Sequence, residues 1–193
     1  ILGSTGSIGR STLDVLKRLP AYRVVGLTAN RDIGTLERQA RAWKPRFVAV
    51  ADEAAARTLK ARLNGSCRVL SGPEGLVEIA GHPAAGTVVS AIVGSAGLAP
   101  TLEAARRGKR IALANKESLV VGGALITTAA AKSGAILLPV DSEHSAIFQC
   151  LAGRHGQPVK RIWLTASGGP FRRPGSLAGM TVAQALRHPT WRM

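Results

Sequence analysis

Two carboxylates stand close together in the second half of the sequence, directly after an apolar run. Asp141 and Glu143 are separated by Ser142 and follow the strand-like segment 135–140. On an extended segment, side chains two residues apart point to the same side, so both carboxylates can reach one cation. Oxygen ligands of this kind suit Mg²⁺ or Mn²⁺. The alternative is structural: Asp141 or Ser142 caps a helix whose first turn contains Glu143.

A second group of polar residues follows another strand-like run. Asn115, Lys116 and Glu117 occur within "LANKESLV" (113–120), at a strand-to-helix turn. Ligands of open α/β sheets bind at such turns. Lys116 is therefore a candidate for contact with a substrate oxygen or phosphate. A helix cap with a surface Lys–Glu pair is the alternative, and spacing alone does not decide between the two.

The sequence begins with a glycine-rich turn, "ILGSTGSIG", in which Gly3, Gly6 and Gly9 recur at every third position. Glycine permits a tight turn and close approach of a pyrophosphate, and the following helix presents free N–H groups. Thr5 and Ser7 add hydroxyl donors. The position after a strand and before a helix predicts a dinucleotide site; a glycine-rich turn without a ligand is the alternative.

The end of the second strand bears on which dinucleotide binds. An NAD enzyme usually carries an acid about 20 residues after the glycines. Here the segment contains Asn30, Arg31 and Asp32. Arg31 stands where a 2′-phosphate needs a cation, and Asn30 can donate hydrogen bonds. The segment therefore favours NADP over NAD, while Asp32 also fits the N-cap of the following helix.

Histidines and an indole complete the candidates. His188 and Trp191 lie in "RHPTW", a Pro-containing loop. Such residues on a loop can cover a bound ligand, and a surface loop with one packed Trp is the alternative. His144, beside the carboxylate pair, is expected to have a structural role.

Strand-like and helix-like stretches alternate along the chain, and several of these candidates lie at strand-to-helix turns. Strand candidates are 1–2, 23–28, 46–50, 68–70, 87–93, 110–114, 135–140 and 161–165. Helix candidates are 8–19, 33–43, 53–63, 74–80, 99–107, 119–131 and 145–151. The strands are short and rich in Val, Ile and Leu, as is typical when helices cover both faces. The sequence predicts an α/β fold: a Rossmann-like, doubly wound, mostly parallel sheet, followed by the beginning of a second, α+β domain.

Composition excludes several classes of protein. The chain has 193 residues, 46% of them hydrophobic, which is typical of globular protein. No apolar run reaches the roughly 18 residues of a membrane span, so we expect no membrane partner. Two cysteines indicate no disulfide framework and fit a reducing cytosol. The net charge of +15 permits polyanion binding, but the cations are scattered and aromatic residues make up only 4%. We therefore expect phosphate-bearing small molecules as partners, and no nucleic acid.

Six motifs together resemble one enzyme family. They are GSTGSIG, AIVGSAGL, LANKESLV, LLPVDSEHSAIFQ, LTASGGPF and HPTW, in this order. This set resembles 1-deoxy-D-xylulose 5-phosphate reductoisomerase, and the resemblance covers the whole chain. It implies an oxidoreductase that rearranges a ketose phosphate and reduces the product with NADPH to 2-C-methyl-D-erythritol 4-phosphate, in the non-mevalonate isoprenoid pathway. The divalent metal it implies is Mg²⁺ or Mn²⁺, with Co²⁺ as a further alternative.

The resemblance also implies the roles of individual residues. Positions matching the family's NADPH contacts are Thr5, Gly6, Ser7, Ile8, Asn30, Arg31, Asp32, Asn115 and Glu117. Positions matching catalytic residues are Lys116, Asp141 and Glu143, of which Asp141 and Glu143 match metal ligands. Positions matching substrate contacts are Lys116, Ser142, Glu143, Ser167, His188 and the flap residue Trp191. Segment 30–32 departs from a common Gly-Lys/Arg-Asn pattern but retains the Arg.

The resemblance further implies how the chain is organised. We expect an NADPH-binding domain at 1–140 and the truncated start of the catalytic domain at 141–193. The family's third acidic ligand lies in a Lys-Gly-Leu-Glu segment that this sequence lacks, so we expect a fragment that is weak or inactive alone. The full-length protein is expected to be a homodimer in the bacterial cytoplasm. Two alternatives are another NADP-dependent oxidoreductase without metal, and a non-enzymatic basic module that binds NADP or nucleic acid.

Overall fold

The structure is a computed structural model that describes residues 1–153, 157–165, 169–171 and 177–187. The chain divides into two compact units, Ile1–Asp141 and Ser142–Met193. Each unit is described by itself below. None of the helices in the described ranges has the length and apolar character needed to cross a membrane.

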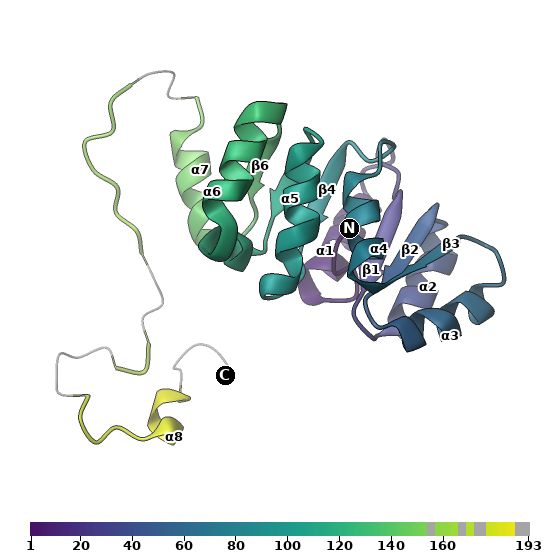
Figure 1. The fold of residues 1–193 in the computed structure, drawn as a ribbon. Helices are drawn as coiled ribbons and strands as arrows, with labels where there is room; N and C mark the ends of the chain where they lie inside the picture. The colour runs from purple at the N-terminus through teal and green to yellow at the C-terminus, as the bar shows by residue number, and fades with distance from the viewer. Residues whose placement is uncertain (154–156, 166–168, 172–176, 188–193) are drawn as a thin grey trace. The chain divides into compact units, whose positions relative to one another are not determined.

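Strands and helices alternate through the first unit (Figure 1). The strands are β1 (Gly26–Ala29), β2 (Phe47–Val50), β3 (Arg68–Ser71), β4 (Thr87–Ser90), β5 (Arg110–Leu113) and β6 (Ile136–Pro139). The helices are α1 (Ser7–Leu16), α2 (Ile33–Trp43), α3 (Glu53–Leu63), α4 (Gly72–Gly81), α5 (Leu98–Arg106) and α6 (Lys116–Ser133), with a 3-10 turn η1 (Ser95–Gly97) before α5. This order confirms the predicted α/β fold, although several boundaries differ by two to four residues.

The N-terminal segment joins two three-stranded parallel sheets. Their orders are β1-β2-β3 and β4-β5-β6. Ile1 O accepts a hydrogen bond of 3.1 Å from Thr28 N in β1, and Leu2 N donates one of 2.8 Å to Val89 O in β4. Leu2 also forms a parallel bridge with Ser90. The resulting order, β3-β2-β1-segment-β4-β5-β6, reverses direction at this segment, and ligands of doubly wound sheets bind at such a point.

Alternation along β2 shows how the sheet buries both faces. Phe47 and Ala49 belong to one buried apolar cluster, and Val48 and Val50 belong to another. Successive side chains of a strand point to opposite faces, so a continuous apolar run serves both clusters. The Val, Ile and Leu content of these strands follows directly from this burial.

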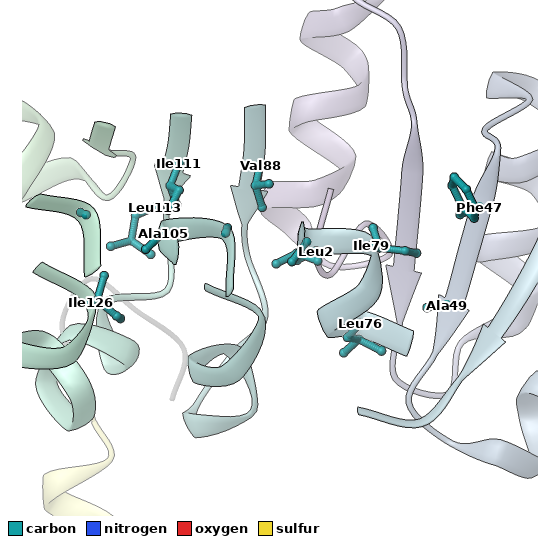
Figure 2. Close-up of a cluster of buried hydrophobic side chains, with 13 residues drawn as sticks. Leu2, Phe47, Ala49, Leu76, Ile79, Val88, Ala105, Ile111, Leu113 and Ile126 are labelled. Carbon is teal, nitrogen blue, oxygen red and sulfur yellow. The ribbon is translucent and has the colours of Figure 1, made fainter. Parts of the chain in front are cut away.

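Different helices cover the two faces. The first cluster includes Leu76 and Ile79 from α4, Ala105 from α5 and Ile126 from α6, all labelled in Figure 2. The second cluster draws on α1, α2 and α3, for example through the fully buried Leu59. Burying a side chain of this size contributes about 1.5–3 kcal/mol. The carboxyl edge of the sheet is thus supported from both sides.

The second unit contains two helices among its described residues, α7 (Ser142–Leu151) and α8 (Val182–Ala185). The strand predicted at 161–165 is wrong: these residues belong to neither a strand nor a helix. A strand needs a neighbour to receive its N–H and C=O groups, and no strand among the described residues pairs with this segment. Arg161 instead lies over the Trp163 ring, at 5.3 Å from its centroid.

Candidate functional site

The glycine-rich turn is fixed by β1 and α2. Gly3 N donates a hydrogen bond of 2.8 Å to Thr28 Oγ1, and Ser4 N donates one of 2.8 Å to Thr28 O. Ser4 Oγ donates to Gln39 Oε1 at 2.7 Å, while Gln39 Nε2 donates to Ser4 O at 2.8 Å. Ser4, Thr28 and Gln39 are all buried. Because each polar group has a partner, the turn is held rigidly before any ligand arrives.

Two positions in this turn require glycine, because neighbouring backbone atoms lie too close to leave room for a Cβ. Gly3 has a φ of +78°, and a Cβ there would lie 2.7 Å from Ala91 O. A Cβ on Gly9 would lie 2.4 Å from Gly3 O and 2.4 Å from Ser4 Cα. The first glycine therefore allows the turn to pass the end of β4, and the third lets α1 pack against the turn.

The N-terminus of α1 is open. Its N-cap, Gly6, provides no side-chain hydrogen bond. Arg10 N makes the first helical bond, to Gly6 O, so the N–H groups of Ser7, Ile8 and Gly9 precede the helical ladder. Ser7 and Ile8 are exposed, and Thr5 beside them is half-buried. An exposed, uncapped helix N-terminus after a glycine turn can bind a phosphate group.

Residues 30–32 are all exposed, but their contacts differ. Asp32 caps α2, since its Oδ1 accepts from Thr35 N at 2.9 Å. This bond from Thr35 chiefly lowers the pKa of Asp32, with smaller contributions from Arg38 and Arg10. Asn30 and Arg31 are exposed.

Arg31 is paired with a residue that follows the next strand, β2. Its Nε donates a hydrogen bond of 3.0 Å to Asp52 Oδ2. Asp52 is also the N-cap of α3, through a 2.9 Å bond from Ala55 N to Oδ1. The bond from Ala55, with a smaller contribution from Arg31, lowers the pKa of Asp52.

Asn115 links the end of β5 to the loop after β4. The residue is 2% exposed. Nδ2 donates at 3.0 Å to Gly94 O and at 3.0 Å to Glu117 Oε2. Oδ1 accepts from Ser118 N at 3.1 Å and from Ser118 Oγ. Asn115 therefore caps the start of α6, which is the structural alternative considered for this segment. Lys116, in contrast, is exposed.

The carboxylate segment lies where the first unit ends and the second begins. α7 begins at Ser142, so Asp141 occupies the N-cap position and Glu143 the first turn. The extended conformation expected here is wrong, because residues from Ser142 onward are helical, so the alternation of side chains along an extended segment does not apply to Asp141 and Glu143. Ser142 Oγ donates to Glu143 Oε2 at 2.8 Å. In the second unit, these two residues line a groove with Ile147, Trp163 and Thr165.

Other expected site residues lie outside the described ranges. These are Ser167, His188 and Trp191. Within the ranges that the structure describes, no three His, Cys, Asp or Glu side chains gather as a metal-binding group. A metal bound by Asp141 or Glu143 would thus take further oxygen ligands from elsewhere.

A cavity of ≈ 910 Å³ in the first unit lies away from these residues. It is lined by residues at the amino ends of the strands, including Arg23, Arg46 and Thr87. None of the predicted site residues that the structure describes lines it. Ligands of open α/β sheets bind at the carboxyl ends, so we assign no cofactor to this cavity.

Sequence reasoning missed the residues that hold the site together. Thr28, Gln39 and Asp52 reach the glycine turn or Arg31 from other elements. Thr28 and Asp52 each stand at or just after a strand end, a signal that could have indicated them. Gln39 gave a weaker signal: a polar residue on the buried face of α2.

The chain matches one family along nearly its whole length. Residues 1–123 match the profile of 1-deoxy-D-xylulose 5-phosphate reductoisomerase, and residues 137–193 match the profile of its C-terminal domain. The chain is 53% identical over 205 residues to the 1-deoxy-D-xylulose 5-phosphate reductoisomerase of Methylococcus capsulatus. It is 51% identical over 199 residues to that of Symbiobacterium thermophilum. The alignments cover 100% of this chain but 52% and 51% of the relatives, so it spans about half their length.

Solved structures of reductoisomerases resemble this chain in both fold and sequence. The reductoisomerase from Zymomonas mobilis in complex with NADPH has a TM-score of 0.90 and 46% identity, covering 97% of this chain and 50% of that one. A DOX-P reductoisomerase solved with NADPH, fosmidomycin and magnesium has a TM-score of 0.85 and 41% identity, covering 100% and 51%. The chain therefore belongs to the 1-deoxy-D-xylulose 5-phosphate reductoisomerase family.

Proposed function

We propose that the protein to which this chain belongs converts 1-deoxy-D-xylulose 5-phosphate to 2-C-methyl-D-erythritol 4-phosphate, using NADPH and a divalent metal. The observation that carries the proposal is the match of both parts of the chain, 1–123 and 137–193, to this one family. The activity is proposed for the whole protein, since the chain spans about half of its relatives.

The first unit is proposed to bind NADPH at the carboxyl edge of its sheet. The open N-terminus of α1 has the free N–H groups that a pyrophosphate needs. Gly3 and Gly9 allow close backbone approach. Arg31 is exposed at the end of β1, where a 2′-phosphate needs a cation. These residues fit the dinucleotide, and the net charge of +15 favours its approach.

The proposed NADPH site retains the residues expected from the sequence, some as contacts and some as supports of the contacting segments. They are Thr5, Gly6, Ser7, Ile8, Asn30, Arg31, Asp32, Asn115 and Glu117. Because the Asn115 side chain is buried and hydrogen-bonded within the protein, we assign it the task of holding Glu117 and the Gly94 loop in place. Asp32 holds the start of α2.

Asp141 and Glu143 are the proposed metal ligands. The chemistry of two carboxylates fits Mg²⁺ or Mn²⁺, with Co²⁺ as an alternative. The metal, when bound, polarises the carbonyl and hydroxyl oxygens of the substrate. Glu143 is the only Asp or Glu after residue 141, in a segment with seven Lys or Arg residues. This charge pattern supports a specific role for its carboxylate.

Further residues are proposed to bind the sugar phosphate. Lys116 is exposed at the turn after β5 and can donate to a substrate oxygen or phosphate. Ser142 is proposed to hydrogen-bond the substrate beside Glu143, to which its hydroxyl is joined. Ser167, His188 and Trp191 complete the proposed substrate contacts.

For the whole protein we propose a cytoplasmic homodimer that binds neither nucleic acid nor membrane. This chain alone is proposed to bind NADPH but to turn over substrate weakly or not at all.

The experiment that tests this proposal restores the remaining sequence. A chimera would join residues 1–193 to the C-terminal half of the Methylococcus capsulatus relative. NADPH oxidation with 1-deoxy-D-xylulose 5-phosphate is then followed with Mg²⁺, with Mn²⁺ and with chelator. We expect oxidation that requires both substrate and metal. Metal-independent oxidation would support a different NADP-dependent oxidoreductase, and salt-sensitive duplex binding without NADPH affinity would support a nucleic-acid-binding module.

A further inference from the structure

The loops after β1 and β2 are joined beyond the ends of the strands. The ladder ends with Ala29 opposite Val50. Two more backbone bonds follow: Ala51 N donates to Ala29 O at 3.0 Å, and Asp52 N donates to Asn30 O at 3.1 Å. This backbone pairing keeps the start of α3 beside the segment that carries Arg31.

The two carboxylate oxygens of Asp52 have separate partners. Oδ1 accepts from Ala55 N and caps α3, while Oδ2 accepts from Arg31 Nε at 3.0 Å. The Asp52 side chain is 26% exposed and therefore partly fixed by its surroundings, whereas the Arg31 side chain is 79% exposed. The more constrained residue therefore holds the freer one.

The contact uses only one edge of the guanidinium. Arginine has five N–H donors, of which Nε supplies one and the two terminal nitrogens supply four. No hydrogen bond from the terminal nitrogens of Arg31 is present among the described residues. These donors form the fork that binds a phosphate through two parallel hydrogen bonds.

We propose that Asp52 is a positioning residue for dinucleotide specificity: it holds Arg31 through Nε so that the terminal nitrogens can bind the adenosine 2′-phosphate of NADPH. This inference rests on the proposed NADPH site. An ordered arginine loses less conformational freedom when the phosphate binds, so the affinity for NADPH is higher than with an unrestrained arginine. NADH lacks the 2′-phosphate and gains nothing from the pair.

The negative charge of Asp52 could have the opposite effect, because a carboxylate competes with phosphate for the same cation. Orientation and competition predict opposite signs, so one substitution distinguishes them. Asp52→Asn removes the charge but keeps an N-cap side chain, since Asn and Asp cap helices about equally well. Glu53→Gln is the matched control: it removes a charge at the next residue, whose carboxylate lies 4.0 Å from Arg57 rather than at Arg31.

The test measures NADPH and NADH affinities of the 193-residue chain by fluorescence titration, with thermal unfolding measured in parallel. We expect Asp52→Asn to weaken NADPH binding about five- to tenfold, the scale of the net contribution of one ordinary hydrogen bond. NADH affinity should stay unchanged, and the unfolding midpoint should fall only slightly, because the variant loses the charge of the cap but keeps its oxygen. Glu53→Gln should retain NADPH affinity. In an Arg31→Ala background, Asp52→Asn should have no further effect on NADPH binding, because Asp52 acts through Arg31.

Unchanged or tighter NADPH binding by Asp52→Asn would overturn the inference, as would an equal loss of NADH affinity, which a merely structural role predicts. In those cases the unaltered chain still binds NADPH and the proposed function stands. If the unaltered chain binds neither dinucleotide, the proposed NADPH site fails, and this inference fails with it.

Discussion

The two units of the chain use their apolar residues differently. In the first unit, apolar residues from strands and helices form two buried clusters. In the second unit, none of the described residues is buried. Ile162, Trp163 and Leu164 are 54%, 80% and 61% exposed. The first unit therefore contains the packing that stabilises its fold, while the described part of the second does not.

The two units also differ in the number of their acidic residues and in what those residues contact. Ten of the eleven acids lie in residues 1–141, and several cap or pair with groups of the same unit, as Asp32 and Glu37 do. The single acid of the second unit, Glu143, lies among seven Lys and Arg residues. Several carboxylates in the first unit thus serve its structure, whereas we propose that Glu143, together with Asp141 at the end of the first unit, serves chemistry.

Truncating one buried isoleucine and one exposed isoleucine would test the difference most strongly. Ile111→Ala removes a fully buried side chain from β5, and we expect a loss of about 2–5 kcal/mol in the free energy of unfolding. Ile162→Ala makes the same chemical change in the second unit and should stay within about 0.5 kcal/mol. Urea unfolding of both variants provides the measurement. Equal losses would show that the second unit has a core of its own.

The proposed metal ligands give the next largest effect. In the chimera used to test the function, we expect Asp141→Asn and Glu143→Gln each to lower turnover about 100-fold, since metal-assisted charge stabilisation contributes several kcal/mol. Higher Mn²⁺ concentrations should restore part of the activity. Glu74→Gln, an exposed first-turn glutamate of α4, is the control and should retain turnover. Full activity of Asp141→Asn would remove the metal role from this segment.

How far the sequence predicted the structure also differs between the units. Helices 33–43 and 53–63 were predicted with the observed bounds. Asp32 and Asp52 mark their N-termini, and Lys44 and Asn64 adopt the left-handed conformation that ends them. Local signals suffice where a helix is capped on both sides and packs on the sheet of its own unit.

Other predictions failed where the outcome depends on distant partners. The strand expected at 161–165 has the right residues but no pairing strand among those described. The contact between Arg31 and Asp52 joins residues 21 positions apart, and only the register of β1 against β2 brings them together. Sequence patterns predict elements better than pairings, because a pairing depends on two elements at once.

A pair of glycines tests the rigidity of the first unit at its proposed cofactor turn. Gly9→Ala places a Cβ 2.4 Å from Gly3 O, and we expect a cost of about 1–3 kcal/mol in unfolding free energy, together with loss of NADPH binding. Gly123→Ala in α6 has no atom within 4 Å of the new Cβ and should stabilise the chain by about 0.5–1 kcal/mol. Calorimetry and NADPH titration measure the two effects. A neutral Gly9→Ala would contradict the close packing of α1 on the turn.

Removing one helix cap from each unit would test the difference between the units with the smallest expected change in stability. Asp32 accepts from Thr35 N at 2.9 Å in the first unit, and Thr181 accepts from Gln184 N at 3.3 Å at the start of α8. We expect Asp32→Ala to cost about 1 kcal/mol at pH 7. Thr181→Ala should leave global unfolding unchanged, because α8 has no buried residue. Equal costs in denaturant unfolding would contradict the contrast between the units.

The charge of the Asp32 cap makes its contribution depend on pH. The hydrogen bond from Thr35 lowers the pKa of Asp32 in the folded state, so on acidification the unfolded chain takes up this proton first. The contribution is therefore fully present above the ordinary aspartate pKa of about 3.9 and is lost as the pH falls through the folded-state value. Asp32→Asn keeps a capping oxygen without a titrating group. The stability difference between the unaltered chain and this variant should hold from pH 7 to about pH 5 and shrink below about pH 4. A difference that grows on acidification would mean that the folded state binds this proton more tightly, against the observed cap.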